Sequence, residues 1–195
     1  MRASKRQIVV DTATRLFSLH GFHPVGVERI IEESGVARMT LYRHFTGKDA
    51  LIKAVLQQRH TVIVGSLKEE LASRATPETR LRGFFDWYGK WFASREFAGC
   101  LFERALAEFG TGNPEISTVA VRYRQTLRGW LQRILTDLVP KSQAAQLATV
   151  FVMLLDGATV EARAFNDPLA AKRAWLAAEV LLAGARRGVM AKPSL

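Results

Sequence analysis

The fold is decided by residues 27–51, which read VERIIEESGVARMTLYRHFTGKDAL. Apolar side chains recur here at the spacing of one helix face, pause at a glycine, and then recur again. Gly35 supplies the tight turn between the two predicted helices. The apolar positions are Val27, Ile30 and Ile31 before the turn, Val36 in its corner, and Leu41 and Phe45 after it. This pattern predicts a helix-turn-helix over about residues 27–46.

The second of these helices is expected to expose a set of side chains suited to the major groove of DNA. The set consists of Arg38, Met39, Thr40, Arg43 and His44, with Tyr42 at its edge. An arginine can bridge guanine O6 and N7, and an apolar side chain can contact a thymine methyl group. Hydroxyl, phenol and imidazole groups can donate to phosphate. Lys48 opens the next helix, whose N-terminal N–H groups also favour a phosphate.

The alternative is that residues 27–45 form an ordinary helical hairpin inside an all-α core, since such hairpins are common. Exposed cations in the second helix favour DNA binding over that alternative, although a motif match alone can be false.

The same stretch strongly resembles the tetracycline-repressor (TetR) family of transcriptional regulators. The resemblance is densest over residues 5–60 and rests on Gly35-Val36, Thr40-Leu41-Tyr42-Arg43-His44-Phe45 and Lys48-Asp49-Ala50-Leu51. It implies a DNA-binding domain over residues 2–60 and a helical ligand-binding and dimerisation domain over residues 61–190. It also implies that Thr40, Tyr42, His44 and Lys48 contact the DNA backbone, while Arg38, Met39 and Arg43 read bases.

Two departures from the family pattern concern the start of the first of these helices. Family members often carry a pair of threonines where this chain has Val25-Gly26-Val27, so the Gly26 amide is expected to replace a hydroxyl at a phosphate. A basic residue is sometimes found where Glu28 lies, and a glutamate that reaches DNA must accept, for example from cytosine N4. The predicted DNA-binding residues are therefore Gly26, Val27, Arg38, Met39, Thr40, Tyr42, Arg43, His44 and Lys48.

Composition narrows the class of protein but does not decide its function. The chain has 195 residues, 28 Lys and Arg against 18 Asp and Glu, a sequence pI of about 10.4 and one cysteine. The apolar content excludes a disordered chain, and one cysteine excludes an internal disulfide framework. A basic chain has a raised chance of binding nucleic acid, but residues 1–50 hold only 8 Lys and Arg against 5 Asp and Glu.

No segment resembles a signal peptide or a membrane span. The longest stretch without a charge, residues 142–155, is shorter than the roughly 18 residues that cross a bilayer. We therefore expect a cytoplasmic protein with no membrane partner.

The periodicity predicts an all-α fold, because no alternating β-branched run is bounded by turn signals. Thr76-Pro77, Asn113-Pro114 and Asp167-Pro168 each pair a capping residue with proline, which is typical of helix starts. The expected helices span residues 4–20, 27–34, 38–44, 48–72, 77–94, 99–109, 114–138, 142–165 and 168–187.

Aromatic residues are dense between positions 84 and 109, and they have two interpretations. For any one of them, core packing is the ordinary role. Together they exceed what a core needs, and ligand pockets are lined by aromatic side chains with few polar anchors. The predicted ligand pocket comprises Phe84, Tyr88, Trp91, Phe92, Phe102, Tyr123, Leu127, Phe151 and Asp156. Other possible polar anchors are Asp86, Glu103 and Arg122.

Asp156 lies in the apolar run VFVMLLDGATV, where an unpaired carboxylate would be costly. We expect it to pair with a nearby arginine, for example Arg163, or with a helix N-terminus. Its alternative role is recognition of a cationic ligand.

The last two long helices are expected to form a homodimer interface, as the resemblance implies. They span about residues 142–165 and 168–187, and the second is rich in alanine, which allows close approach of helices. The expected bundle residues are Leu176, Val180, Leu181, Leu182, Phe151, Val152, Leu155 and Thr159. Two recognition helices must lie about 34–36 Å apart to enter successive major grooves, so a dimer predicts a palindromic operator.

No catalytic residues, metal site or cofactor is expected. The four histidines lack the spacing of a zinc motif, and no nucleophile elbow or phosphate loop is present. Cys100 is expected to be a small buried residue, the alternative being a redox-sensing thiol activated by Arg104. The predicted function is a ligand-responsive regulator, chiefly a repressor, which a small apolar or aromatic molecule releases from DNA. The alternative is a helical small-molecule-binding protein or enzyme with no DNA role.

Overall fold

The computed structural model describes residues 3–187, and these residues form helices without strands. The helices are α1 (Lys5–His20), α2 (Val27–Ser34), α3 (Arg38–His44), α4 (Lys48–Ala72), α5 (Pro77–Phe92), α6 (Leu101–Phe109), α7 (Pro114–Thr136), α8 (Lys141–Phe165) and α9 (Ala170–Arg186). The all-α prediction is confirmed, and each predicted helix end lies within two residues of the observed one.

Capping groups explain several of these helix starts. Thr76 accepts from the Thr79 amide, and Thr79 in turn accepts from the Thr76 amide, which makes a reciprocal cap before Pro77. The Asn113 side chain accepts from the Ile116 amide in the same way. Asp167 instead caps the turn before α9 by accepting from the Leu169 amide, so this helix begins two residues later than predicted.

The chain folds into two compact units. Within the described residues, unit 1 comprises residues 3–63 and 100–123, and unit 2 comprises residues 64–99 and 124–187. Helices α4 and α7 therefore contribute to both units. The ends of the two predicted domains at residue 2 and at residues 188–190 lie outside the described part of the chain.

The core of unit 1 is built on aromatic contacts between distant segments. The Phe17 and Phe22 rings lie 5.0 Å apart, and Phe109 of α6 lies 5.5 Å from Phe22. Phe17, Phe22, Ile30 and Leu41 are fully buried. These contacts hold the short helices α2 and α3 against α1.

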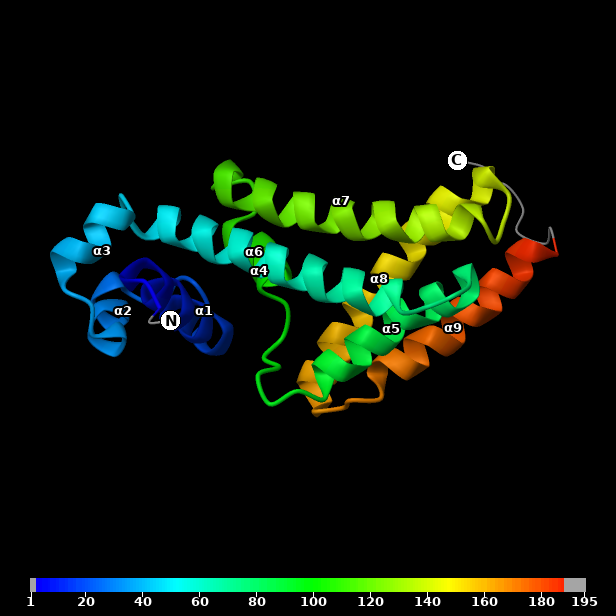
Figure 1. Ribbon diagram of the computed structural model, residues 1–195, viewed down its shortest axis with the longest axis horizontal. Coiled ribbons are helices and arrows are strands. Elements are labelled where there is room, and N and C mark those ends of the chain that lie inside the picture. The colour runs from blue at the N-terminus through cyan, green and yellow to red at the C-terminus, as the bar shows by residue number, and fades with distance from the viewer. Residues whose placement is uncertain (1–2, 188–195) are drawn as a thin grey trace. The chain divides into compact units, whose positions relative to one another are not determined.

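The core of unit 2 lies where α5, α8 and α9 meet, and α9 runs beside both α5 and α8 (Figure 1). The Phe85 ring packs edge-on against Phe151 at 5.9 Å and Trp175 at 5.3 Å. Alanines on α8 and α9 are buried where these helices approach each other, as expected for close packing.

Among the described helices, α8 alone has the length and apolar composition of a membrane span. This is weak support for a membrane role, because the core helix of a globular protein passes the same test. Its buried residues include Leu147, Phe151 and Leu155.

Candidate nucleic-acid interface

The turn between α2 and α3 is fixed by backbone geometry and one hydroxyl. Gly35 has φ +62° and ψ +20°, a left-handed conformation that glycine adopts without steric cost. The Ser34 hydroxyl donates to the Ile31 carbonyl and accepts from the Val36 amide. Val36 is 2% exposed and fills the inside of the corner, as predicted.

Ion pairs and a cation–π contact surround this turn. Glu33 at the end of α2 accepts from Arg15 of α1 and from Arg29 one helical turn earlier. These two hydrogen bonds lower the pKa of the Glu33 carboxyl below its ordinary value. The Arg6 guanidinium lies 5.2 Å from the centre of the Phe45 ring, next to the end of α3.

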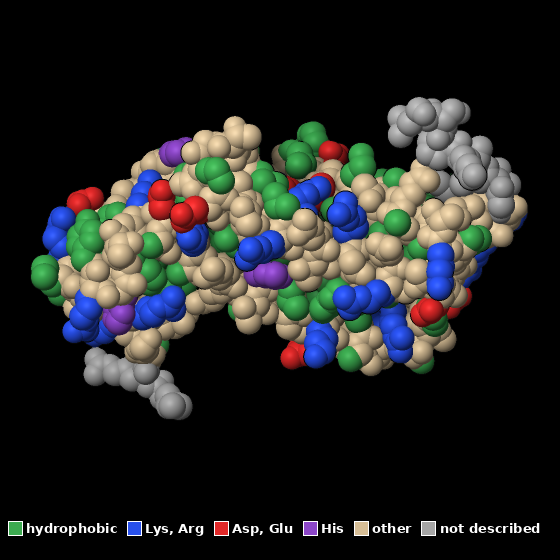
Figure 2. All heavy atoms as spheres, turned by 90° about the horizontal axis from the view of Figure 1, so that it is seen from above, with side chains coloured by type: hydrophobic (Ala, Val, Ile, Leu, Met, Phe, Trp, Pro, Cys, Tyr) green, Lys and Arg blue, Asp and Glu red, His purple; other side chains and the backbone are tan. Residues whose placement is uncertain are grey.

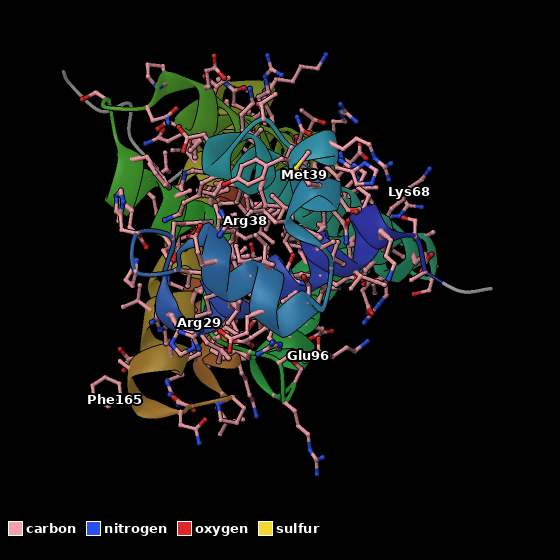
Figure 3. All side chains as sticks on the ribbon, turned by 90° about the vertical axis from the view of Figure 1, so that its left-hand side faces the viewer. Arg29, Arg38, Met39, Lys68, Glu96 and Phe165 are labelled. Carbon is pink, nitrogen blue, oxygen red and sulfur yellow. The ribbon has the colours of Figure 1, made fainter. Side chains whose placement is uncertain are left out.

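The predicted recognition side chains lie on the solvent-facing side of α3. Met39 is 80% exposed and Tyr42 41% exposed, and Figure 3 looks onto the end of the molecule where Arg38 and Met39 are labelled. Arg43 and His44 are also exposed, while Thr40 is half-buried. Leu41 is fully buried between them, so one short helix has a packed side and an open side. Their contacts with DNA stay a prediction.

Arg38 has a partner that the sequence did not suggest. Its guanidinium lies 3.2 Å from a carboxylate oxygen of Glu28 on α2, and both side chains are largely exposed. From the sequence, Glu28 was considered only as an acceptor from a base in the case that it reaches DNA. In the structure it instead holds a side chain predicted to read bases.

Lys48 is more enclosed than a simple phosphate-binding lysine. Its ammonium donates to the His23 carbonyl at 3.1 Å, and burial lowers its pKa while Glu108 and Asp49 oppose that effect. Glu108 of α6 also accepts from the backbone amides of Phe22 and His23, at 3.0 and 2.7 Å. Lys48 and Glu108 thus fix the loop between α1 and α2 from two directions.

The beginning of α2 matches what the sequence required of a phosphate contact. Gly26 is the N-cap residue with an extended backbone, and no side chain accepts from the first amides of the helix. Gly26 is exposed and Val27 half-buried. The amide groups here are therefore open to an external acceptor.

The predicted pocket residues are divided between the two units. Phe102 and Tyr123 belong to unit 1, where their rings stack 3.9 Å apart, and His60 lies edge-on to Tyr123 at 5.9 Å. The others belong to unit 2, and most of them are buried: Phe84, Tyr88, Phe92, Leu127 and Phe151 are at most 6% exposed, whereas Trp91 and Asp156 are half-buried. The set does not form one cluster inside either unit.

In unit 2 the aromatic residues of α5 contact one another. Tyr88 lies edge-on to Trp91 at 5.7 Å and to Phe92 at 5.9 Å, and Phe97 follows at 5.0 Å from Phe92. Within the unit these rings therefore have a packing role, which was the ordinary interpretation of each one. Asp86, a possible anchor, pairs with Arg74 and Arg82. Glu103 and Arg122, the other possible anchors, are half-buried and exposed.

Asp156 pairs with an arginine, as expected, but the partner is not Arg163, the example that the sequence suggested. Asp156 accepts from Arg124 of α7 at 2.5 Å, with both side chains about one-third exposed. Arg163 instead packs over Gly99, where a Cβ atom would lie 2.8 Å from the arginine Cδ. Gly99 also has φ +91°, so two constraints favour glycine there.

Helices α8 and α9 carry an exposed apolar strip. It consists of Met153, Val160, Phe165, Leu169, Leu176 and Val180, each at least 53% exposed. Leu176 and Val180 were among the expected bundle residues. Phe151, Val152, Leu155, Thr159 and Leu182 were also expected there, but they are buried inside unit 2, and Leu181 is half-buried. The outward face of α8 and part of that of α9 were therefore misassigned.

Of the remaining candidate residues, Cys100 is half-buried just before α6. Arg104, which the redox-sensing alternative would require beside the thiol, donates to the Phe17 carbonyl at 3.1 Å. No group of three or more metal-ligating side chains occurs among the described residues.

Comparison with known proteins agrees with this architecture. The model of the N-terminal region of "Bacterial regulatory proteins, tetR family" matches residues 9–55, and the model of the "Tetracyclin repressor-like, C-terminal domain" matches residues 77–178. A TetR-family regulator from Streptomyces coelicolor, SCO4454, is 30% identical with a TM-score of 0.86, and the match covers 93% of this chain and 96% of that one.

Curated relatives are more distant but of the same kind. The uncharacterised HTH-type regulator YxaF of Bacillus subtilis is 21% identical over 80% of this chain and 83% of its own length. The repressor ComR of Escherichia coli is 23% identical over 81% and 79%. The activator FasR of Mycolicibacterium smegmatis is 31% identical, but the match spans 44% of this chain and 41% of that protein.

An all-helical chain with an exposed recognition helix in an N-terminal helix-turn-helix defines a DNA-binding transcriptional regulator. The chain belongs to the tetracycline-repressor family.

Proposed function

We propose that this regulator is a repressor that binds a palindromic operator as a homodimer and leaves it when a small apolar or aromatic molecule binds. The observation that carries this proposal is the open side of α3, where Arg38, Met39, Tyr42 and Arg43 lie exposed on a helix anchored by Leu41. A rigid helix with exposed donors and apolar groups suits direct reading of the major groove.

In this proposal residues 2–60 form the DNA-binding domain and residues 61–190 the ligand-binding and dimerisation domain. Arg38, Met39 and Arg43 contact base edges. Gly26, Val27, Thr40, Tyr42, His44 and Lys48 position the helix on the phosphate backbone. The Glu28 carboxylate, which lies beside Arg38, accepts from the base next to the one that Arg38 reads.

The homodimer forms through α8 and α9. These two helices expose six large apolar side chains, and exposed apolar patches typically mark protein interfaces. Introducing a charge at the centre of this exposed apolar strip with Val160→Glu should yield a folded monomer by analytical ultracentrifugation. Val62→Glu, at a comparably exposed valine of α4, is the control and should leave the dimer intact.

The inducer binds among the predicted pocket residues of unit 2, which are Phe84, Tyr88, Trp91, Phe92, Leu127, Phe151 and Asp156. The part that Phe102 and Tyr123 of unit 1 play in the pocket stays a prediction. The inducer must bind the DNA-incompetent state more tightly than the competent one, and DNA must then weaken inducer binding by the same factor. A thermal-shift screen against apolar and aromatic compounds, repeated with operator present, tests this linkage. Compounds that raise Tm equally with and without operator would contradict it.

The experiment that tests the proposal as a whole is selection of duplexes from a random library by the full-length protein. A repressor of this type should enrich a palindrome whose half-site centres lie about one helical turn, roughly 10 base pairs, apart or a multiple of it. When the selected duplex is placed upstream of a reporter gene, production of the protein in the cytoplasm of the same host cell should lower expression of the reporter. If the selection enriches no sequence, the alternative of a helical ligand-binding protein or enzyme is favoured. If expression of the reporter rises, the protein is an activator rather than a repressor.

A further inference from the structure

The molecule carries a second candidate ligand site, which shares no residue with the predicted inducer pocket. It is a hollow of about 530 Å³ in unit 2, between the C-terminal half of α5 and the beginning of α9, and we call it the α5–α9 hollow. We propose that it binds a small organic carboxylate with a flat apolar body, such as an arylcarboxylate. Its volume lies in the range of small-molecule sites.

The floor of the hollow is aromatic. Phe85 and Trp175 both line it, with ring centres 5.3 Å apart and the rings nearly perpendicular. Gly89 of α5 and Ala171 of α9 also line it, and these small residues let the two helices approach closely there. A flat apolar ligand can therefore contact ring surface on one side and small residues on the other.

One buried donor in this lining has no acceptor. Trp175 is 6% exposed, and its indole Nε1 has no hydrogen-bond partner among the described residues. By contrast, the Trp87 indole donates to the Ser66 hydroxyl at 2.9 Å. Buried indole N–H groups usually find a partner, so the unmatched donor at Trp175 points to an acceptor that the chain itself does not supply.

The rim of the hollow is cationic. Arg74, Arg82, Lys90 and Lys172 all line it, whereas Asp86 is the one carboxylate in its lining. Asp86 pairs with Arg74 and Arg82, and Glu70 nearby pairs with Arg74 and Lys90. Lys172 is exposed and takes part in none of the ion pairs found among the described residues, and the neighbouring carboxylate of Asp167 pairs with Arg173 instead.

The backbone adds to this preference for negative charge. Pro168, Leu169, Ala171 and Lys172 bring the N-terminus of α9 to the hollow, where Asp167 accepts from the Leu169 amide and the N-cap residue Leu169 itself offers no side-chain acceptor to the amides that follow. The partial positive charge of a helix N-terminus favours an anion. Cations and a helix terminus thus line the same hollow as Phe85 and Trp175, and the Arg82 guanidinium lies 5.3 Å from the centre of the Trp175 ring, an arrangement that a carboxylate with an apolar body would fit.

A smaller hollow in unit 2 also has cations and a tryptophan in its lining, but it lacks the buried indole donor without an acceptor. Lys68, Arg80, Arg133 and Trp130 line a space of about 300 Å³. Trp130 is half-buried, and its indole Nε1 is not among the buried donors that lack an acceptor. Trp130 therefore serves as an internal reference for the experiment.

The test is a titration of the full-length protein with 2-naphthoate, observed through the ¹⁵N-labelled indole signals of its four tryptophans. Trp175→Phe assigns the signal of the α5–α9 hollow by removing it. We expect saturable movement of the Trp175 signal, about fivefold weaker binding in Lys172→Gln, and unchanged binding in Lys141→Gln, an exposed lysine of α8. The uncharged 2-naphthamide should bind at least fivefold more weakly than 2-naphthoate.

Three results would overturn the proposal. They are movement confined to Trp87, Trp91 or Trp130, equal losses in the Lys172 and Lys141 variants, and equal binding of the acid and the amide. Circular dichroism of each variant establishes that it is folded. Because no DNA is present, a failure here leaves the repressor proposal untouched.

Discussion

Met39 and Tyr42 on α3 are 80% and 41% exposed, whereas Phe84 and Tyr88 on α5 are 0% and 4% exposed. The side chains proposed to read DNA are thus already presented on a fixed helix in unit 1. The aromatic side chains of α5 in unit 2 instead pack against one another.

The difference follows from the chemistry of the two partners. DNA is recognised from outside by donors on an open surface, so the helix beneath them must be rigid. A small apolar ligand is recognised by burial, so it must separate packed rings or occupy a hollow beside them. Lys and Arg side chains are spread over both units rather than gathered on the recognition helix, as Figure 2 shows for one face. The overall charge of the chain is therefore a poorer guide to the DNA-binding surface than the positions of individual Lys and Arg side chains.

The largest effect should come from the core that makes unit 1 rigid. Phe22 is fully buried between Phe17 and Phe109, so Phe22→Ala should lower the free energy of unfolding by about 3–5 kcal/mol. Urea denaturation followed by circular dichroism measures this. Leu19→Ala, at a residue of α1 that is 58% exposed, should change stability by less than about 0.5 kcal/mol. Similar losses in both variants would mean that unit 1 is loosely packed.

Arg38→Ala tests whether the open surface reads bases. It should cost about 1–3 kcal/mol of binding to the selected duplex and relax the preference at one base position. Fluorescence anisotropy with duplexes substituted at each position measures both effects. Arg128→Ala, an exposed arginine of α7, is the control and should keep the wild-type preference. An unchanged base preference in Arg38→Ala would mean that Arg38 reads no base and that its role is the ion pair with Glu28.

Glu108→Gln tests the support of the loop that precedes α2. The carboxylate accepts from the Phe22 and His23 amides, and an amide side chain can accept with only one of its two terminal atoms. The variant should lose about 1–2 kcal/mol of stability in thermal unfolding. Glu115→Gln, whose side chain is 76% exposed in its pair with Lys53, should lose much less. Equal losses would show that the loop does not depend on Glu108.

The smallest effect concerns pH. Burial lowers the pKa of His60 below its ordinary value of about 6.5, so the folded state binds a proton less readily than the unfolded state. Its contribution to stability is therefore complete above about pH 6.5 and declines as the pH falls toward the lower folded pKa. His60→Gln should flatten the fall in Tm between about pH 7.5 and 5.5, whereas His44→Gln on exposed α3 should not. If Tm of His60→Gln falls with pH as steeply as that of the wild type, His60 does not cause the loss of stability at low pH.

Local patterns in the sequence were sufficient for the helices and for the open side of α3. Gly35, Val36 and Leu41 act within a few residues of one another, so their roles follow from spacing alone. Contacts between distant segments were not predictable. Glu108 binds amides 85 and 86 residues away, and no local pattern marks that pairing.

The same limit explains the errors in unit 2. Asp156 pairs with Arg124 of α7 rather than with Arg163 of its own helix, because the packing of α7 against α8 decides which arginine is near. Helical periodicity also could not say which side of α8 faces its own unit and which faces outward. Phe151 is buried, whereas Met153, two positions along, is 62% exposed.

The central claim is that α3 and the residues beside it bind DNA, and titration of the selected duplex at two salt concentrations tests it most directly. The wild-type protein should lose affinity steeply with salt, since phosphate contacts release counterions. Tyr42→Ala combined with Lys48→Ala should weaken binding to all sequences alike and reduce the slope of log affinity against log salt by about one for the lysine. Unchanged affinity and slope in that variant would contradict the proposed placement on DNA.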